Sequence, residues 1–325
     1  MKKITFYQII NQTLFDLMKR NKKIVAFGLG IDDPKALFGT TKNLKKKFGD
    51  NRVFDFPTSE NAMTGIGIGM SLNGMIPIMT HLRLDFFLLA MDQLVNNAAK
   101  WNIMFGGQNK IPITIRLIIG RGWGQGPTHS QNLQSWFAHI PGLKVVMPTF
   151  PSDAYNLLKK SIRDPNPVIF AESAGLYGTK GEVPEEYFDI EIGKADTKQE
   201  GTDITLISYG HGMPMINKVS EELLKKNVSS EIIDLRSLSP IDYDLINKSV
   251  QKTGRALLLD TARKNGGVMA EVATNINEDS GDYLDGPILR VGSEDVPWPY
   301  NRKLEQHAMS SVPKIMNKIE QGYSL

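Results

Sequence analysis

The regular alternation of short apolar runs with longer helical patterns is the feature that most constrains how this chain can fold. Several of the runs are apolar at every position, as parallel strands are when helices cover both faces of their sheet. The pattern therefore predicts an α/β protein with doubly wound sheets. Strands are expected at 24–28, 76–80, 113–119, 144–148, 168–172, 205–210, 231–236, 256–260 and 288–292, and helices at 85–104, 151–163, 214–226 and 267–278.

The segment 176–203 interrupts this pattern. It is rich in charged residues, glycine and proline and lacks strong periodicity, which is typical of a linker between domains. A chain of 325 residues is long enough for two domains, each with its own core. We therefore expect a first domain at residues 1–186 and a second domain at residues 187–325.

Composition excludes several classes of function. The 38 basic and 35 acidic side chains give a net charge of +3, and no basic stripe indicates a nucleic-acid surface. The chain has no cysteine, which rules out thiol catalysis and disulfides. No apolar run is long enough to span a bilayer, and the N-terminal residues lack the pattern of a signal peptide. We expect a cytoplasmic protein with no nucleic-acid or membrane partner.

Familiar catalytic and cofactor motifs are absent or misplaced. The run GIGIGM at 65–70 superficially resembles a dinucleotide fingerprint, but it follows an acid inside a predicted helix instead of a strand and turn. Its glycines are expected to permit close backbone packing. Neither a G-x-S-x-G elbow nor an H-E-x-x-H zinc motif occurs in the sequence.

One acid and one histidine are candidates for catalysis. Glu60 is the single carboxylate at the entrance to the apolar, glycine-rich run, where a helix would ordinarily serve only for packing. His129 follows a predicted strand and the glycine-rich segment GRGWGQGPT. Such a loop at the carboxyl end of a strand is where α/β folds bind ligands.

Several segments, in order, resemble the beta subunit of thiamine-diphosphate-dependent 2-oxoacid dehydrogenases, the decarboxylating component of the pyruvate, branched-chain and acetoin dehydrogenase complexes. They extend from about Ile24 to the C-terminus and comprise FGDNRVFDFPTSENAMTGIGIGM, LAMDQLVNNAAKW, PTHSQNLQSWFAHIPGLKVVMP, SIRDPNPVIFAES and SEDVPWPY. The resemblance implies a thiamine-diphosphate pyrimidine-binding domain followed by a transketolase C-terminal-type domain, which agrees with the two domains expected from composition.

The resemblance also implies roles for single residues. Glu60, in the family's P-x-S-E motif, would contact a ring nitrogen of the cofactor's aminopyrimidine, and an apolar environment favours the neutral acid that can hold a proton there. Thr58 would line the pocket, Leu82 would be the apolar wedge that bends the cofactor, and Phe86 would pack on the pyrimidine. His129 would bind a substrate oxygen and move a proton. Without the resemblance, Leu82 and Phe86 are predicted to be ordinary core residues.

The segment SIRDPNP at 161–167 resembles the family's monovalent-cation loop. The resemblance implies a potassium site with ligands from Ser161, Ile162, Asp164 and Asn166 and from the carbonyl of Ile113. Oxygen ligands suit a hard cation. The alternative is a helix end closed by a proline-containing turn, and the sequence favours neither.

The superfamily's motif for Mg²⁺ and diphosphate, GDG followed by NN, is missing. The fragments GDN at 49–51 and NN at 96–97 do not reproduce it. The resemblance therefore implies an alpha subunit that holds the diphosphate and Mg²⁺, so that thiamine diphosphate lies between two chains, and a second beta subunit. It also implies a lipoyl acyltransferase core, although LLLDTARKNGG at 257–267 lacks the acidic pair of many relatives.

The sequence departs from the family pattern at MTHLRLDF, residues 79–86. Familiar relatives are mostly apolar there, whereas this chain carries His81, Arg83 and Asp85. If any of the three faces the pocket, the substrate or acceptor is more polar than pyruvate, because an unpaired charge in a dry site is costly. In the later loop, Arg121 and Trp123 would add an anion clamp and a stacking surface. The alternative is a solvated loop or an internal Arg83–Asp85 pair.

Three functions remain open. The first is oxidative decarboxylation of a 2-oxo acid, with transfer to lipoamide or another acceptor, by a beta subunit that is active only with its alpha subunit. The second is a transketolase-like or acyloin-forming carboligase subunit in a biosynthetic pathway. The third is a non-catalytic structural subunit, against which the joint presence of Glu60, Phe86 and His129 argues.

Overall fold

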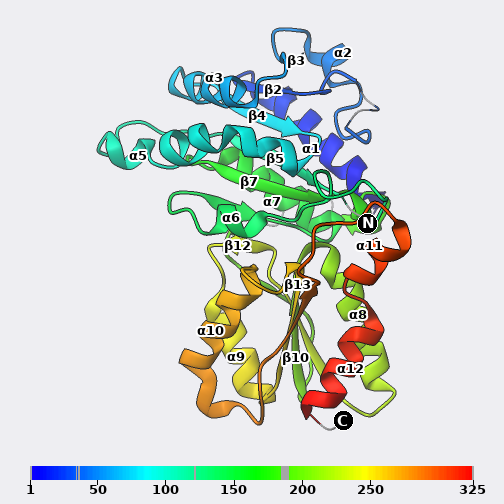
Figure 1. Ribbon diagram of the computed structural model, residues 1–325. Coiled ribbons are helices and arrows are strands. Elements are labelled where there is room, and N and C mark those ends of the chain that lie inside the picture. Colours follow the sequence, from blue (N-terminus) through cyan, green and yellow to red (C-terminus); the bar gives the residue numbers. More distant parts are fainter. Residues whose placement is uncertain (1, 34, 36, 121, 184–189, 324–325) are drawn as a thin grey trace. The chain divides into compact units, whose positions relative to one another are not determined.

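The computed structural model describes residues 2–33, 35, 37–120, 122–183 and 190–323, shown in Figure 1. They form two compact units, and each is described by itself. Unit 1 comprises 1–120 and 136–192, and unit 2 comprises 121–135 and 193–325. The expected boundary between residues 186 and 187 lies outside the described residues. A loop from the first half of the sequence thus belongs to unit 2.

Unit 1 is built on a parallel sheet with the strand order β6-β7-β5-β4-β2-β3. Its strands are β2 (Ile24–Gly28), β3 (Val53–Asp55), β4 (Ile76–His81), β5 (Thr114–Ile119), β6 (Lys144–Val146) and β7 (Val168–Ser173). A separate antiparallel pair joins β1 (Lys2–Thr5) to β8 (Lys180–Val183). Because β5 and β7 are buried at every position, this sheet is covered on both faces, as the sequence predicts.

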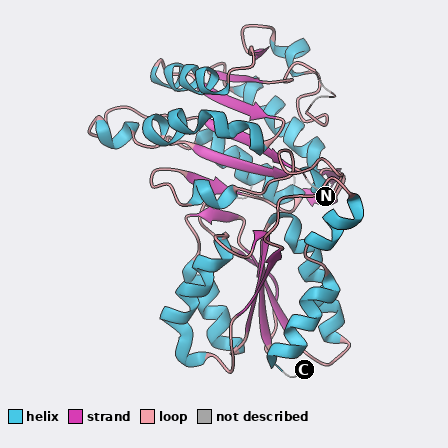
Figure 2. Cartoon of the chain, viewed as in Figure 1, coloured by secondary structure: helices cyan, strands magenta, loops and turns pink. Residues whose placement is uncertain are grey.

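Helices connect these parallel strands (Figure 2). Between residues 6 and 176 they are α1 (Phe6–Arg20), α2 (Leu44–Phe48), α3 (Glu60–Leu72), α4 (Leu84–Phe87), the 3₁₀ helix η1 (Leu88–Ala90), the π-helix η2 (Gln93–Ala98), α5 (Trp101–Met104), α6 (Gln134–Ala138), α7 (Pro151–Arg163) and the 3₁₀ helix η3 (Ala174–Leu176). α7 has Pro151 in its first turn and Lys160 and Arg163 in its last, an arrangement that suits the helix dipole.

The expected helix at 85–104 is wrong as a single element. The chain forms α4, η1, η2 and α5 there instead. Within η2 the side chains of Asn96 and Asn97 donate to Asp92 and Gln93, four residues earlier. Asparagine is a weak helix former because its amide competes for local hydrogen bonds, so this part of the segment supports a regular helix poorly.

Unit 2 contains a five-stranded sheet in the order β14-β13-β10-β11-β9, in which only β9 is antiparallel to its neighbour. Its strands are β9 (Asp196–Gln199), β10 (Ile204–Ser208), β11 (Ser230–Asp234), β13 (Ala256–Arg263) and β14 (Leu289–Ser293), and a short strand, β12, spans Ser237–Ser239. Its helices are η4 (Gly210–Gly212), α8 (Met213–Leu224), α9 (Tyr243–Thr253), α10 (Val268–Ser280), η5 (Gly281–Tyr283), α11 (Arg302–Ala308) and α12 (Val312–Tyr323). Figure 1 shows α8 and α12 on one face of the sheet and α9 and α10 on the other.

A fully buried ion pair crosses two strands of unit 1. Arg116 on β5 and Glu172 on β7 are inaccessible to solvent, and Nε of Arg116 lies 2.5 Å from Oε1 of Glu172. Nη2 of Arg116 donates to Oε2 at 2.9 Å, as does the hydroxyl of Tyr177. Burial and the charge of Glu172 raise the pKa of Tyr177, so its hydroxyl remains a donor. The two charges are therefore satisfied inside the core.

Replacing one partner of this pair is expected to destabilise unit 1 strongly. Arg116→Met leaves the Glu172 charge buried and unpaired, which costs about 3–5 kcal/mol of unfolding free energy. The double variant Arg116→Met/Glu172→Gln removes that charge and keeps an acceptor for Tyr177, so it should recover much of the loss. Urea unfolding followed by circular dichroism measures both. Equal losses in the two variants would contradict the role assigned to the charge.

Candidate active site

The predicted cofactor residues of unit 1 follow the carboxyl ends of nearby strands. β3 leads through Thr58 to α3, and β4 leads through Leu82 to α4. Only β2 separates β3 from β4 in the sheet. The carboxyl ends of parallel strands meet at one edge, where ligands bind in α/β folds. The local topology therefore places these segments at the edge where a cofactor site is expected.

Glu60 is the first residue of α3 and is only 5% exposed. Thr64, one turn later on the same face, contacts Met79 of β4 at 3.7 Å. Because α3 connects two parallel strands, it runs antiparallel to β4, and Glu60 lies toward the carboxyl end of that strand. Among the described residues, its carboxylate has no hydrogen-bond or ion-pair partner. A carboxylate that is largely buried and makes no hydrogen bond to these residues is available to a ligand.

A glycine allows the close packing that buries this side of α3. A Cβ added to Gly67 would lie 2.8 Å from Cδ1 of Ile113 and 3.1 Å from Cζ of Phe27. Gly67 thus brings the helix onto the sheet, as expected from the GIGIGM run. The dinucleotide-binding alternative is also disfavoured by the structure, because all of residues 65–70 lie inside α3.

The other three predicted cofactor residues differ in exposure. Thr58 is exposed in the loop before α3, whereas Leu82 and Phe86 are half-buried. Leu82 packs partly against the apolar core of unit 1. The structure is thus compatible with both the wedge role and the core role of Leu82, and these assignments remain predictions.

His81 and Arg83 are both buried in unit 1. The ring of His81 is inaccessible to solvent and packs 4.9 Å from the ring of Phe87, and neither ring nitrogen has a hydrogen-bond partner among the described residues. Burial lowers the pKa of His81 to about 3, so the imidazole is neutral at ordinary pH. Burial also lowers the pKa of Arg83, and the nearby charge of Asp85 opposes this shift. The solvated-loop alternative is therefore disfavoured for both residues.

His129 lies in unit 2, in the loop that precedes α6. Its ring is half-buried, and Nδ1 lies 2.9 Å from the hydroxyl oxygen of Thr128. Its amide donates to the carbonyl of Gly126 at 3.4 Å. Trp123 is 37% exposed, and Arg121 lies outside the described residues. The loop presents an accessible imidazole, which is what a proton-transfer role requires.

Comparison with protein families and relatives identifies the family to which the chain belongs. Residues 2–180 match the transketolase pyrimidine-binding domain, and residues 193–315 match the transketolase C-terminal domain. The chain is 38% identical over 321 residues to the pyruvate dehydrogenase E1 component subunit beta of Rhizobium meliloti (strain 1021), covering 98% of this chain and 70% of the relative. It is 38% identical over 303 residues to the same subunit of Bacillus subtilis (strain 168), covering 93% of each. The chain belongs to the family of pyruvate dehydrogenase E1 beta subunits.

A solved structure shows the same fold as this E1 beta family member. It is described as a split-gene transketolase, an inactive beta4 tetramer, and it aligns with a TM-score of 0.81 over 99% of both chains at 20% identity. The expected combination of a pyrimidine-binding domain and a transketolase C-terminal-type domain is confirmed. In this family member, residues 122–135 fall inside the matched pyrimidine-binding range but make their contacts with unit 2.

The predicted potassium loop of this family member is closed by its own contacts. Oδ2 of Asp164 lies 2.5 Å from Nζ of Lys144, and Oδ1 accepts the amide of Asn166 at 3.0 Å. The carbonyls of Ser161 and Ile113 each accept a backbone amide, at 3.2 and 3.0 Å. These contacts are those expected of a proline-containing turn, and the cation site remains a prediction.

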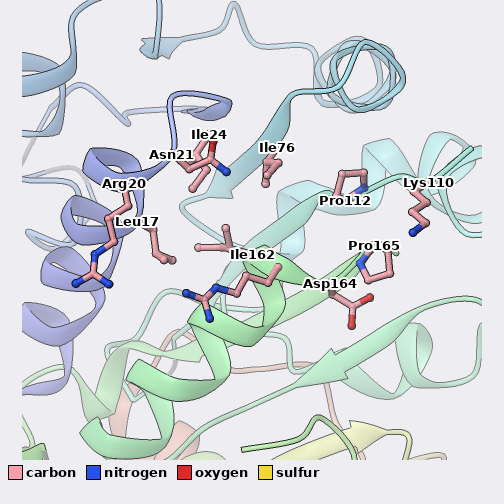
Figure 3. A pocket seen from close by; sticks show the side chains of 11 residues that line it. Leu17, Arg20, Asn21, Ile24, Ile76, Lys110, Pro112, Ile162, Asp164 and Pro165 are labelled. Atoms are coloured by element: carbon pink, nitrogen blue, oxygen red, sulfur yellow. The ribbon is translucent and has the colours of Figure 1, made fainter. Parts of the chain in front are cut away.

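A cavity of about 370 Å³ in unit 1 lies at the opposite ends of the strands (Figure 3). Its lining includes Ile162 and the first residues of β2 and β4, Ile24 and Ile76. In Figure 3, Arg20 and Lys110 lie at opposite sides of the cavity and do not converge. This cavity is therefore separate from the edge that follows β4 and is not the candidate active site.

The part of the chain that the structure describes lacks metal-binding clusters and membrane-spanning helices. No three His, Asp or Glu side chains gather there in a way that could hold a metal ion. Within the same residues, no helix has both the length and the apolarity needed to cross a bilayer.

Sequence reasoning missed the groups that hold the His129 loop. Glu305, in α11, is a fully buried acid that contacts the start of this loop. Tyr209, Asp260 and Thr261 form a buried network at its other end. The one signal available was the family-like segment SEDVPWPY, which ends directly before α11.

Stability should depend on pH through His81. The unfolded chain binds a proton on this histidine below about pH 6.5, whereas the folded chain binds it only near pH 3. Stability therefore falls as pH drops below 6.5, by up to about 1.4 kcal/mol per unit. His81→Phe should flatten this slope between pH 7 and pH 5, and urea midpoints measure it. The exposed His139, changed to Gln, is the control; a slope unchanged in His81→Phe would refute the assignment.

Proposed function

We propose that this chain is the catalytic beta subunit of a thiamine-diphosphate-dependent 2-oxoacid dehydrogenase, with Glu60 as the residue that holds a proton at the cofactor's pyrimidine ring. The observation that carries the proposal is the buried, unpartnered carboxylate of Glu60 at the ligand-binding edge of a transketolase-type pyrimidine domain. The chain's relatives named as pyruvate dehydrogenase E1 beta subunits support it.

The chain's own residues have distinct tasks in this proposal. Glu60 would donate a hydrogen bond to a ring nitrogen of the cofactor and hold the proton there. Phe86 and Leu82 orient the ring, and Thr58 lines the entrance. His129 binds an oxygen of the 2-oxo acid and moves a proton. When bound, thiamine diphosphate supplies the electron sink that allows carbon dioxide to leave.

The buried residues at the end of β4 and directly after it bear on the choice of substrate. His81 is neutral at ordinary pH, and Arg83 is buried close to the charge of Asp85. Neither residue is therefore proposed to bind a substrate carboxylate directly. Their proposed effect is on the shape and polarity of the wall behind Leu82. The His129 loop is then proposed to bind the substrate carboxylate. Arg121 of this loop is a candidate for that role from the sequence alone.

An alpha subunit is proposed to supply the diphosphate and Mg²⁺ half of the site. The sequence lacks the GDG motif that holds Mg²⁺ and diphosphate in this superfamily. Ile66 and Leu72 of α3 are 43% and 37% exposed, and Leu89 of the adjacent η1 is 68% exposed. Large exposed apolar side chains on the helix that begins at Glu60 are suited to a protein partner. A second beta subunit, a lipoyl acyltransferase core and a cytoplasmic location belong to the same proposal.

The decisive variant is Glu60→Gln in the chain reconstituted with its alpha subunit. Turnover of a 2-oxo acid should fall about 100- to 10,000-fold, because the amide cannot shuttle a proton to the ring. The unliganded variant should be at least as stable as the native chain, since a buried carboxylate without a partner is removed. The assay uses candidate 2-oxo acids with either lipoamide or an aldehyde acceptor, which also separates dehydrogenase from carboligase.

The exposed Glu182→Gln is the matched control and should leave turnover unchanged. Near-normal turnover of Glu60→Gln would end the proposal. A fall in turnover accompanied by a loss of stability would assign Glu60 a structural role instead.

The isolated chain should bind thiamine diphosphate and Mg²⁺ weakly or not at all. Calorimetric titration of the chain alone, and of the chain with its alpha subunit, measures the difference. Tight binding by the isolated chain would overturn the proposed division of the site between two subunits.

A further inference from the structure

The glycine-rich loop that carries His129 is held at both ends by unit 2. At its start, the amide of Gly122 donates to Oε1 of Glu305 at 2.7 Å, and the amide of Gly124 donates to Oε2 at 2.8 Å. Glu305 is fully buried in the short helix α11. Because each carboxylate oxygen accepts one amide, the contact fixes the orientation of the loop as well as its distance from α11.

Tyr300 adds packing to this contact. A Cβ added to Gly126 would lie 2.2 Å from Cε1 of Tyr300, and one added to Gly124 would lie 2.7 Å from the carbonyl oxygen of Tyr300. Both glycines also have a positive φ, of +79° and +70°. The loop therefore needs glycine at these positions to approach the segment before α11.

The far end of the loop is held by a second set of hydrogen bonds. Asn132 donates to the carbonyl of Thr261 at 2.8 Å, and Gln134 donates to the hydroxyl of Tyr209 at 2.9 Å. Tyr209 in turn donates to Asp260 at 2.6 Å. All of these groups are buried. Burial is the main cause that raises the pKa of Tyr209, and the charge of Asp260 adds to it, so the Tyr209 hydroxyl keeps its proton and remains a donor.

His129 lies between these two anchors, five residues after Gly124 and three before Asn132. We propose that Glu305 is a positioning residue for His129: its buried carboxylate fastens the glycine-rich loop, so that unit 2 sets the place of the imidazole. This inference rests on the role given to His129 in the proposed function. The transketolase C-terminal-type domain would then contribute to catalysis, because its residue Glu305 positions the loop that carries His129.

Glu305→Gln tests the contact with little change in shape. The amide nitrogen of glutamine would face one of the two glycine amides, donor against donor, and one hydrogen bond would be lost. In the complex with the alpha subunit, the loop peptide should exchange its amide hydrogens faster by mass spectrometry. Turnover should fall about 10- to 100-fold, as expected for a misplaced catalytic group, with little change in cofactor affinity.

A double-variant cycle separates positioning from a general structural effect. Glu305→Gln should lower kcat in the native background but add no further loss in His129→Ala, because both changes act through the same imidazole. Glu294→Gln is the control, since Glu294 is an exposed acid of unit 2 paired with Lys314. If Glu305→Gln does not fold, Tyr300→Ala is the second variant, because it leaves no buried charge unpaired. It should also speed amide-hydrogen exchange in the loop, and it should cause no further loss of kcat in the His129→Ala background.

Unchanged exchange in the loop, or an equal loss of kcat in the native and His129→Ala backgrounds, would overturn the inference. A second outcome is normal turnover of His129→Ala together with faster amide-hydrogen exchange of the loop in Glu305→Gln. The proposed role of His129 would then be wrong, and the positioning of a catalytic group with it, although the contact itself would stand.

Discussion

The candidate site depends on burying a carboxyl group that has no partner among the described residues. Glu60 reaches this state because α3 packs closely on the sheet through Gly67, and because the helix begins at the acid itself. The helix dipole favours a negative charge at this position but offsets only part of the cost of removing it from water. A chain that retains such a group keeps a ready hydrogen-bonding site for a ligand. Folding and ligand binding make opposite demands on this residue, as is common at functional sites.

Much of the fold was predictable because its signals are local. β2 and α7 have the bounds expected from the sequence, since a fully apolar run and a helix with proline at its start and basic residues at its end are each determined over a few residues. The pairing of β1 with β8, and of β9 with β11, was not expected. β8 and β9 are largely polar, and they become strands only through partners supplied by the folded chain.

Glu60 and His129 could be named as candidates from the sequence because they follow strand ends and lie in family motifs, and their roles remain predictions. The hydrogen bond that fastens the His129 loop to Glu305 could not be predicted. Gly122 and Glu305 are 183 residues apart, and nothing in either local sequence indicates the other. The burial of His81 was also hidden. From the sequence it could be solvated or could face the ligand, and only the packing against Phe87 shows it to be neutral and buried.

Two buried acids thus contribute in opposite ways. Glu305 has both oxygens occupied by backbone amides, which makes it a fixed point for a glycine-rich loop with little stability of its own. Glu60 has its oxygens unoccupied by the described residues, which leaves it available to a ligand. A catalytic protein needs both kinds of group, because some residues must be available to a ligand while others hold loops in place. Both carboxylates are removed from most of the surrounding water. Backbone amides replace that water at Glu305, whereas at Glu60 a ligand would have to do so.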